Sequence, residues 1–298
     1  MTETRPAVGL GPMDYPGLFD AADRASLRGQ RSFLRSLQLR MTATTVAAAS
    51  AAFTVTVGRS FDAAAVVTAL AFVTAIVVEL SVRQSRPNVT WYEGRALSES
   101  VKTLAWRYAV GGTPCALSLS EAEADRVLLD RVQALQADLP SVPLLPTTRG
   151  VISDRMREIR AASRAERTSA YLTGRIQDQQ RWYATKADYH RRRARILRGV
   201  VLLLEVTGVS AALAKAFALV SFDLAGIVAA SVAGLSAWSQ ARQHTTAATA
   251  YTVASHELSV IRELLSREMS EAEWAATVAD AEDAISREHT LWRASHGE

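Results

Sequence analysis

Two pairs of apolar runs dominate the hydrophobic pattern of the chain, and each pair surrounds a short polar loop. Residues 41–57 and 63–80 flank a loop that ends in Ser60-Phe61-Asp62, and residues 200–220 and 224–240 flank Ser221-Phe222-Asp223. The two runs of the first pair are each about 17 residues long, at the lower edge of what crosses a bilayer as a helix. Because the loops are short, the two runs of a pair must fold back on each other. The pattern therefore predicts two transmembrane helical hairpins with four spans.

The two hairpins resemble each other in sequence. The segment from Ser60 to Val67 aligns without a gap with the segment from Ser221 to Val228. We interpret the chain as a tandem repeat, with one two-span domain at residues 20–138 and a second at residues 153–298. A proline-rich linker at residues 139–152 separates them, and residues 1–19, rich in glycine and proline, are expected to form a flexible N-terminus.

Helices are also expected outside the hairpins, because apolar residues recur there every three or four positions. Two capping boxes mark predicted helix starts, the first formed by Thr90 with Glu93 and the second by either Ser118 with Glu121 or Ser120 with Glu123. Gly111-Gly112-Thr113-Pro114 marks a predicted helix end. No segment alternates apolar and polar residues over a useful length. The predicted fold class is therefore all-α, a membrane protein whose long cytosolic helices pack as a bundle or coiled coil.

Arginine residues crowd the outer flanks of both hairpins, whereas the loops between the spans carry few charges. They precede the spans as Arg28, Arg31, Arg35 and Arg40, and again as Arg191, Arg192, Arg193, Arg195 and Arg198. The positive-inside rule then places both hairpin loops on the far side of the membrane and both termini in the cytoplasm. Such clusters also suit the anionic headgroups of a lipid bilayer.

Two other interpretations of these patterns compete with the membrane hairpins. The net charge of +4 admits a nucleic-acid partner, but no aromatic stacking platform accompanies the arginines, so no nucleic acid is expected. The apolar runs are short and rich in alanine, which also suits core helices of a soluble bundle. That alternative stays open at the level of the sequence.

Catalytic chemistry finds little support in the sequence. The single cysteine, Cys115, excludes an intramolecular disulfide and fits a reducing compartment. Among His190, His244, His256 and His289 no two lie four residues apart as metal ligands do on a helix, and no glycine-rich phosphate loop followed by lysine occurs. We expect no enzymatic activity, no cofactor and no bound metal.

A few residues within the predicted spans are candidates for function. Glu205 and Lys215 lie in the third span, and Glu79 ends the second. Ionisable residues in a span often line a water-filled path, but they also pair with arginine or reach the headgroups. Both interpretations, pore lining and pairing, remain open. Gly226, Ala230 and Gly234 recur every four residues in the fourth span, a spacing that favours close helix packing in lipid.

The segment after the first hairpin resembles the SLATT family, which consists of two-span membrane effector domains. The resemblance rests on Trp91-Tyr92-Glu93-Gly94-Arg95, Glu99-Ser100-Val101-Lys102, Trp106-Arg107-Tyr108 and Gly111-Gly112-Thr113-Pro114. The second half resembles another branch of that family through Trp182 and Tyr183, and through Glu288, His289 and Trp292. We assign these motif residues a structural role, with aromatic side chains packing helices and Arg95, Glu99 and Lys102 forming surface ion pairs.

This resemblance implies bacterial proteins of the inner membrane that form pores or disrupt the bilayer in conflict systems, including antiphage defence. It also implies a separate nucleotide-signalling or sensor partner, since the chain carries no recognisable synthetase or sensor domain. We therefore expect a homo-oligomeric membrane effector. The alternative is a non-conducting, membrane-anchored scaffold that recruits cytosolic partners.

Overall fold

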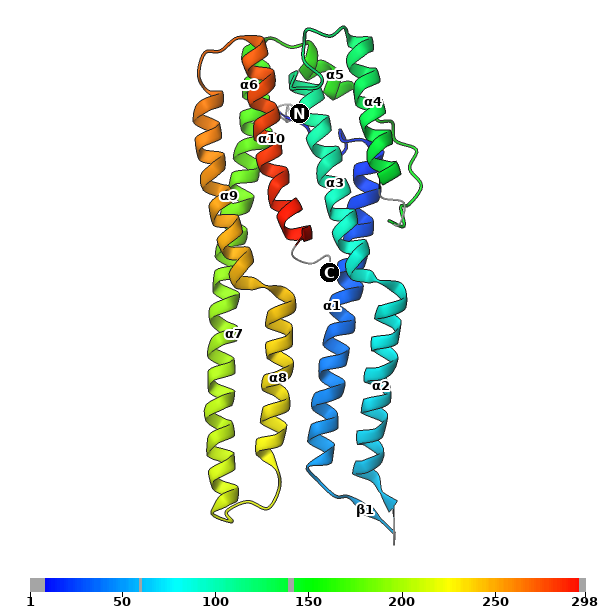
Figure 1. The fold of residues 1–298 in the computed structure, drawn as a ribbon, viewed down its shortest axis with the longest axis vertical. Coiled ribbons are helices and arrows are strands. Elements are labelled where there is room, and N and C mark those ends of the chain that lie inside the picture. Colours follow the sequence, from blue (N-terminus) through cyan, green and yellow to red (C-terminus); the bar gives the residue numbers. More distant parts are fainter. Residues whose placement is uncertain (1–8, 59–60, 139–141, 295–298) are drawn as a thin grey trace, which may run out of the picture. The chain divides into compact units, whose positions relative to one another are not determined.

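The computed structural model describes residues 9–58, 61–138 and 142–294, with the backbone alone for residues 287–294. This part of the chain is almost entirely helical, as the sequence predicts (Figure 1). The elements in order are α1 (Gly17–Ala51), β1 (Thr56–Val57), β2 (Phe61–Asp62), α2 (Ala63–Ser85), α3 (Pro87–Val110), α4 (Glu121–Asp138), α5 (Asp154–Ala161), α6 (Arg164–Tyr171), the π-helix η1 (Leu172–Gln177), α7 (Asp178–Ala216), α8 (Leu224–Arg242), α9 (His244–Leu265) and α10 (Glu271–Ala294).

The chain forms two compact units, and each takes segments from both halves of the sequence repeat. Residues 31–87 and 188–248 form one unit, which we call the membrane unit. Residues 1–30, 88–187 and 249–298 form the other, which we call the head unit. Neither unit is continuous in sequence, because the chain enters and leaves each hairpin from the head unit.

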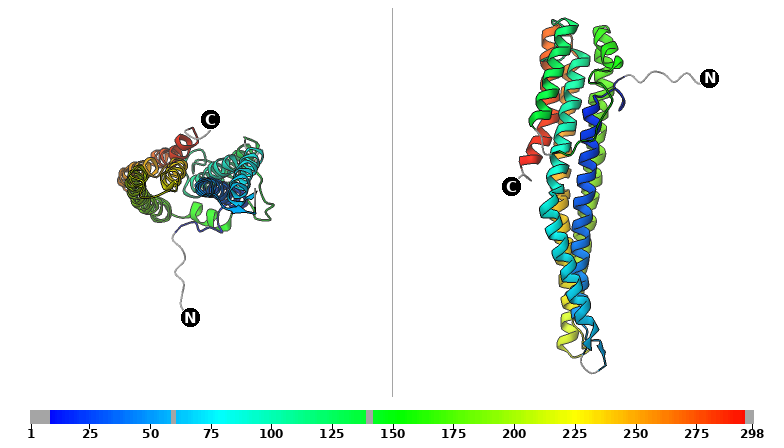
Figure 2. Two further views of the ribbon diagram at one scale, coloured as in Figure 1. Left: turned by 90° about the horizontal axis from the view of Figure 1, so that it is seen from below. Right: turned by 90° about the vertical axis from the view of Figure 1, so that its right-hand side faces the viewer.

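The membrane unit contains the apolar hairpins. Among the described residues, three helical stretches are long and apolar enough to cross a membrane, and they contain α2, α7 and α8. Figures 1 and 2 both show α1 and α2 running side by side. On α2 the buried residues are Ala64, Ala71 and Val78, seven apart, whereas larger side chains such as Leu70 and Ile76 are exposed. Small residues inside and large apolar residues outside are the arrangement that suits a helix in lipid.

The first predicted span differs from the rest. Residues 41–57 were expected to be one helix, but α1 ends at Ala51, and Thr56 and Val57 pair with β2 instead. The β-branched residues from Thr54 to Val57 favour extended backbone, and Gly58 follows with a φ of 71°. For that reason α1 is not among the three stretches long and apolar enough to span, although its Ala43 and Ala47 are buried.

The head unit has an aromatic core built from distant parts of the chain. The ring of Tyr171 lies 5.8 Å from that of Trp106 on α3 and 6.0 Å from that of Trp274 on α10. Trp106 Nε1 donates to the hydroxyl of Tyr15 (3.0 Å), and Trp274 Nε1 donates to the carbonyl of Val110 (2.7 Å). Both indole donors are therefore satisfied in a fully buried setting. Tyr15 and Leu10, in the segment expected to be flexible, are buried here.

The capping boxes and glycines of the sequence predicted two helix boundaries correctly and one helix start incorrectly. The Ser120–Glu123 capping box precedes α4, with Ser120 N donating to Glu123 Oε2 (2.9 Å), and α3 ends at Val110, just before Gly111 with its φ of 74°. The Thr90 start was wrong, because α3 already begins at Pro87. Proline suits the first helical position since it lacks the N–H that would be unpaired there.

Candidate functional site

The aspartate of the repeated Ser-Phe-Asp motif caps a helix in both hairpins. Asp62 caps α2, where its Oδ1 accepts hydrogen bonds from Ala64 N (2.9 Å) and also from Val55 N across the turn (3.1 Å). Asp223 caps α8 and accepts from Gly226 N (3.3 Å). The repeat in sequence is thus a repeat in structure, with each aspartate starting the returning helix of its hairpin.

Lys215, a predicted pore-lining residue, is paired at the end of the second hairpin. Its Nζ lies 3.4 Å from Asp223 Oδ1, so it joins the last turn of α7 to the cap of α8. Its side chain is about half exposed. This geometry corresponds to ion pairing at the end of the span.

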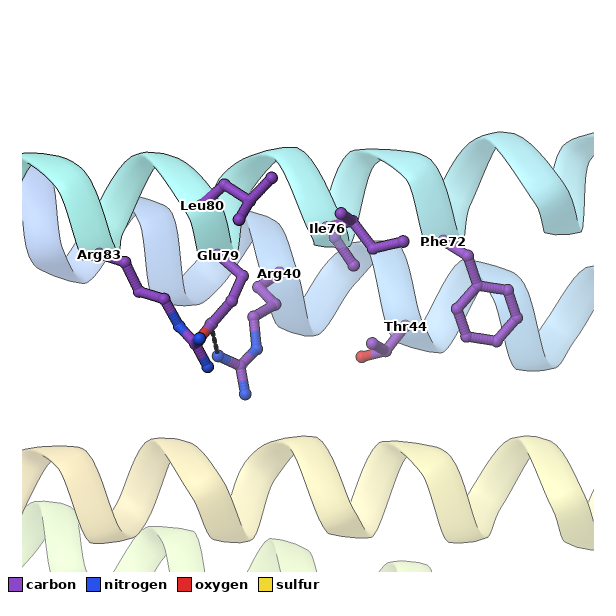
Figure 3. A pocket seen from close by; sticks show the side chains of 8 residues that line it. Arg40, Thr44, Phe72, Ile76, Glu79, Leu80 and Arg83 are labelled. Carbon is purple, nitrogen blue, oxygen red and sulfur yellow. Dashed lines mark hydrogen bonds and ion pairs between the residues drawn. The ribbon is translucent and has the colours of Figure 1, made fainter.

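Glu79, the second such candidate, lies between two arginines in the membrane unit. Its Oε1 accepts from Arg83 Nε (3.0 Å), and its Oε2 accepts from Arg40 Nη1 on α1. Figure 3 shows Glu79 and Arg40 facing each other across the first hairpin. The carboxylate therefore links α1 to α2 and leaves the cluster with a net positive charge.

Glu205, the third candidate, is exposed on α7 among large apolar side chains such as Leu202 and Val209. It lies seven residues after Arg198, or about 10 Å along the helix, well inside the apolar stretch. Within the described residues it forms no ion pair, either with Arg198 or with another arginine. Its carboxylate is thus an exposed acidic group within an apolar stretch of the membrane unit.

Two small residues of α8, Gly226 and Gly234, have different neighbours. A Cβ placed on Gly234 would lie 3.6 Å from Met41 Cε and 3.9 Å from Met41 Cβ, so α8 packs on α1 of the other hairpin. A Cβ on Gly226 would instead meet the Asp223 carboxylate at 2.7 Å. Gly208 on α7 faces Val228 on α8, within one hairpin. Gly234 thus supports packing between hairpins, whereas Gly226 supports the cap.

Two histidines that are far apart in sequence meet in the membrane unit. His190 Nδ1 and His244 Nδ1 are 3.0 Å apart, and His244 is buried. Spacing along the sequence gave no sign of this contact because the two residues belong to different helices, α7 and α9. No group of three or more His, Cys, Asp or Glu residues within the described chain is arranged to hold a metal ion.

A buried ionic network lies inside the head unit. Arg175 binds Glu282 through two hydrogen bonds, Nε to Oε1 at 2.9 Å and Nη2 to Oε2 at 2.7 Å. Their side chains are 1% and 0% exposed, so this is a fully buried ion pair. Tyr171 Oη donates to Glu282 Oε1 (3.0 Å), and Thr103 Oγ1 donates to Glu282 Oε2 (2.9 Å). All the strong acceptor positions of Glu282 are used, as a buried carboxylate requires.

The backbone around this network departs from the α-helix. Arg175 lies in η1, a π-helix between α6 and α7. A π-turn holds one extra residue and rotates the side chains that follow it. Burial, and then the charge of Glu282, raises the pKa of the Tyr171 hydroxyl well above its ordinary value of 10.0, so Tyr171 stays a hydrogen-bond donor.

The first family motif lies on α3 and packs the head unit, as expected for its aromatic residues. Trp106 and Tyr108 are fully buried, and Tyr108 Oη donates to Asp125 Oδ1 (2.5 Å). Arg107 Nη2 donates to the Ala279 carbonyl (2.9 Å) on α10. The two glycines after α3 allow close approach, since a Cβ on Gly112 would lie 2.5 Å from Val278 Cγ1. Pro114 follows in the turn.

The charged part of the same motif lies deeper than predicted. Arg95 pairs with Glu99 at 3.3 Å, but Glu99 is buried, so the pair is not on the surface. The Lys102 ammonium lies 5.8 Å from the ring centre of Tyr15, and burial together with the charge of Arg175 lowers the pKa of Lys102. Trp91 and Tyr92 stack with ring centres 5.1 Å apart.

The second family motif is only partly described. Trp182 and Tyr183 form an aromatic cluster with Tyr251 on α9, at ring distances of 5.3 and 5.7 Å. Glu288, His289 and Trp292 lie in the last turns of α10, and their side chains are outside the described part of the chain.

Family models match the chain in two adjacent segments. Residues 16–168 match the SMODS and SLOG-associating 2TM effector domain 3, called SLATT_3, which covers more than half of the chain. Residues 171–292 match the SMODS and SLOG-associating 2TM effector domain 1, called SLATT_1. The chain belongs to the SLATT family. No curated protein and no solved structure matches it.

The chain thus carries two tandem SLATT domains, which are two-span membrane effector domains of conflict systems. The geometry shows how the two domains are joined. Thr103 comes from the first domain and Glu282 from the second, and they share a buried hydrogen bond in the head unit. Gly234 of the second domain faces Met41 of the first in the membrane unit. Both units are therefore built jointly by the two SLATT domains.

Proposed function

We propose that this protein is an oligomeric effector that permeabilises the bacterial inner membrane, with both termini in the cytoplasm. The observation that carries the proposal is Glu205, a carboxylate exposed on the membrane unit within an apolar helical stretch. A charged side chain in a span is costly against lipid and usually faces a partner or a water-filled path. Several copies around an axis would turn this face of α7 from lipid to water.

One chain is too small to enclose such a path by itself. The buried residues of the membrane unit are mostly alanines, including Ala43, Ala47, Ala64, Ala71 and Ala211. Small side chains bring helices together and leave little space between them. Conduction would thus require several subunits that bring their α7 faces carrying Glu205 together around one axis. The large apolar side chains of α2 would then face the lipid.

The trigger in this proposal is external. Residues 16–168 and 171–292 match SLATT effector domains, and neither match is to a sensor or synthetase domain. A nucleotide-signalling or sensor protein would act on the head unit and release the effector in antiphage defence. We propose no enzymatic activity and no cofactor for this chain, and no nucleic-acid partner.

The test is single-channel recording in a planar bilayer, combined with mass photometry of the detergent-purified protein. We expect a defined multimer and discrete current steps, and Glu205→Leu should remove the steps or change their ion preference. Glu257→Gln, an exposed carboxylate on α9 in the head unit, is the matched control and should leave conductance unchanged. A correctly inserted multimer that is electrically silent under every trigger condition would refute the pore.

The second candidate function is the non-conducting scaffold, which the joint construction of the head unit favours. In a scaffold the spans only anchor the helical head, so Glu205→Leu and Lys215→Leu should both leave partner recruitment intact. Silent bilayers together with stoichiometric capture of a cytosolic protein by the head unit would support this function.

A further inference from the structure

An open groove runs along the first hairpin between α1 and α2. It has a volume of about 440 Å³ and is lined by Arg40, Thr44, Phe72, Ala75, Ile76, Glu79, Leu80 and Arg83. Figure 3 shows the charged side chains at one end of this groove and Phe72 at the other. The groove is therefore amphipathic along its length, with a cationic end and an apolar end.

The cationic end has hydrogen-bonding capacity to spare. A guanidinium carries five N–H donors. Arg83 gives Glu79 only its Nε donor, and Arg40 gives Glu79 a donor from Nη1, so each keeps four for other acceptors among the described residues. Their side chains are 75% and 51% exposed, so these donors are accessible. Two arginines against one glutamate leave one positive charge, which suits an anionic group with several oxygens.

The groove as a whole, from its cationic end to its apolar end, has about the length of one membrane leaflet. From Arg83 to Phe72 is eleven residues of α2, or about 16 Å along the helix. Half of a typical hydrocarbon core is about 15 Å. Phe72, Ile76 and Leu80 are each more than half exposed, so they offer their apolar surface to a ligand rather than to the protein interior.

We propose that this groove binds one anionic phospholipid of the leaflet in which Arg40 and Arg83 lie. The phosphate accepts hydrogen bonds from Arg40 and Arg83, while Glu79 holds the two guanidinium groups apart and in place. One acyl chain lies along Leu80, Ile76 and Phe72. Free phosphate matches only the cationic end and a zwitterionic lipid lacks the net negative charge, so the groove as a whole fits the anionic lipid best. The lipid site requires membrane insertion but not conduction. The lipid-binding proposal can therefore be refuted or supported independently of the proposed pore.

The test uses the full chain, purified in neutral detergent, with lipid binding counted by native mass spectrometry. Phosphatidylglycerol, phosphatidylcholine and inorganic phosphate are titrated separately. We expect tight retention of one phosphatidylglycerol, and about tenfold weaker binding in the variant Arg40→Gln with Arg83→Gln, as expected for loss of about 1.4 kcal/mol of contact energy. The control is Arg192→Gln with Arg195→Gln, which removes the same charge from exposed positions on α7.

A second variant separates the two ends of the groove and guards against misfolding. Ile76→Trp fills the apolar end and leaves both arginines in place, so it should weaken phosphatidylglycerol binding. Equal retention of phosphatidylcholine by the unaltered chain would overturn the proposal. So would displacement of the lipid by millimolar inorganic phosphate, or unchanged binding in the double arginine variant.

Discussion

Thr103 and Glu282 share a buried hydrogen bond of 2.9 Å although 179 positions separate them in sequence. The bond joins α3, from the SLATT_3 match, to α10, from the SLATT_1 match. Because Glu282 also binds Arg175 and Tyr171, one carboxylate holds together three segments of the head unit. The stability of the head unit should therefore depend strongly on this residue.

Replacing Glu282 with glutamine should destabilise the protein by about 3–5 kcal/mol, because Arg175 would stay buried without its counter-charge. Thermal unfolding followed by circular dichroism should show a Tm about 10 °C lower. Glu257→Gln, on the exposed face of α9, should leave the Tm almost unchanged. Replacing both members of the pair, with Arg175→Met and Glu282→Leu, should recover much of the loss. Equal Tm values for Glu282→Gln and the control would contradict the assigned role.

Cys115 should resist alkylation in the folded protein. Its side chain is fully buried, and burial raises the pKa of its thiol from 9.0 to about 11. The thiolate is the reactive form, so two pKa units lower the reaction rate about 100-fold at pH 8. Reaction with iodoacetamide, followed by mass spectrometry, should be slow in buffer and should rise about tenfold per pH unit below pH 11. Complete labelling within minutes at pH 8, at the rate of the denatured chain, would contradict this burial.

The contact between Gly234 and Met41 predicts a cross-link within one chain. The Cβ positions lie 3.9 Å apart, close to the mean of about 3.8 Å in disulfides. Met41→Cys with Gly234→Cys, in a Cys115→Ser background, should form a disulfide on mild oxidation and shift the monomer band on a non-reducing gel. Val73→Cys with Gly234→Cys is the control, since Val73 is exposed on α2. Cross-linked dimers in place of a shifted monomer would show that the two hairpins pair between chains.

Loss of the helix cap should be more severe at Asp62 than at Asp223. Asp62 Oδ1 accepts from Val55 N, Ala64 N and Ala65 N, whereas Asp223 accepts from Gly226 N alone. Asp62→Ala should cost about 1–2 kcal/mol in free energy of unfolding, and Asp62→Asn much less, because asparagine caps helices nearly as well. Chemical unfolding in detergent measures both values. A larger loss for Asp223→Ala would show that its ion pair with Lys215 outweighs its cap.

The sequence predicted the parts of this structure that depend on local pattern. The continuous apolar runs identified the hairpins, and the runs predicted to begin at residues 63 and 224 coincide with the starts of α2 and α8. Local pattern was less reliable where two signals compete. The apolar character of residues 52–57 suggested helix, but their β-branched side chains end α1 at Ala51.

The interior of the head unit was beyond prediction because its contacts are long-range. Arg175 and Glu282 lie 107 positions apart, and each occurs among other charged residues that are exposed. Nothing in the spacing distinguishes a buried arginine from one in solvent. The same holds for His190 and His244, which meet only because α7 and the start of α9 approach each other. The groove at Arg40 and Arg83 likewise depends on how α1 and α2 align, which the hairpin pattern leaves undetermined.

The shared core of the head unit also fixes an order of events during synthesis. Thr103 leaves the ribosome 179 residues before Glu282, which corresponds to about 9–36 s of translation. During that time the first hairpin can already enter the membrane. Trp106 and the rest of the apolar face of α3 stay uncovered until α10 packs against them. This apolar face of the nascent chain must therefore be kept from aggregating until α10 has been made. A molecule truncated before Trp274 would insert its hairpins into the membrane but would lack α10. Its head unit would be incompletely packed and therefore a target for proteolysis.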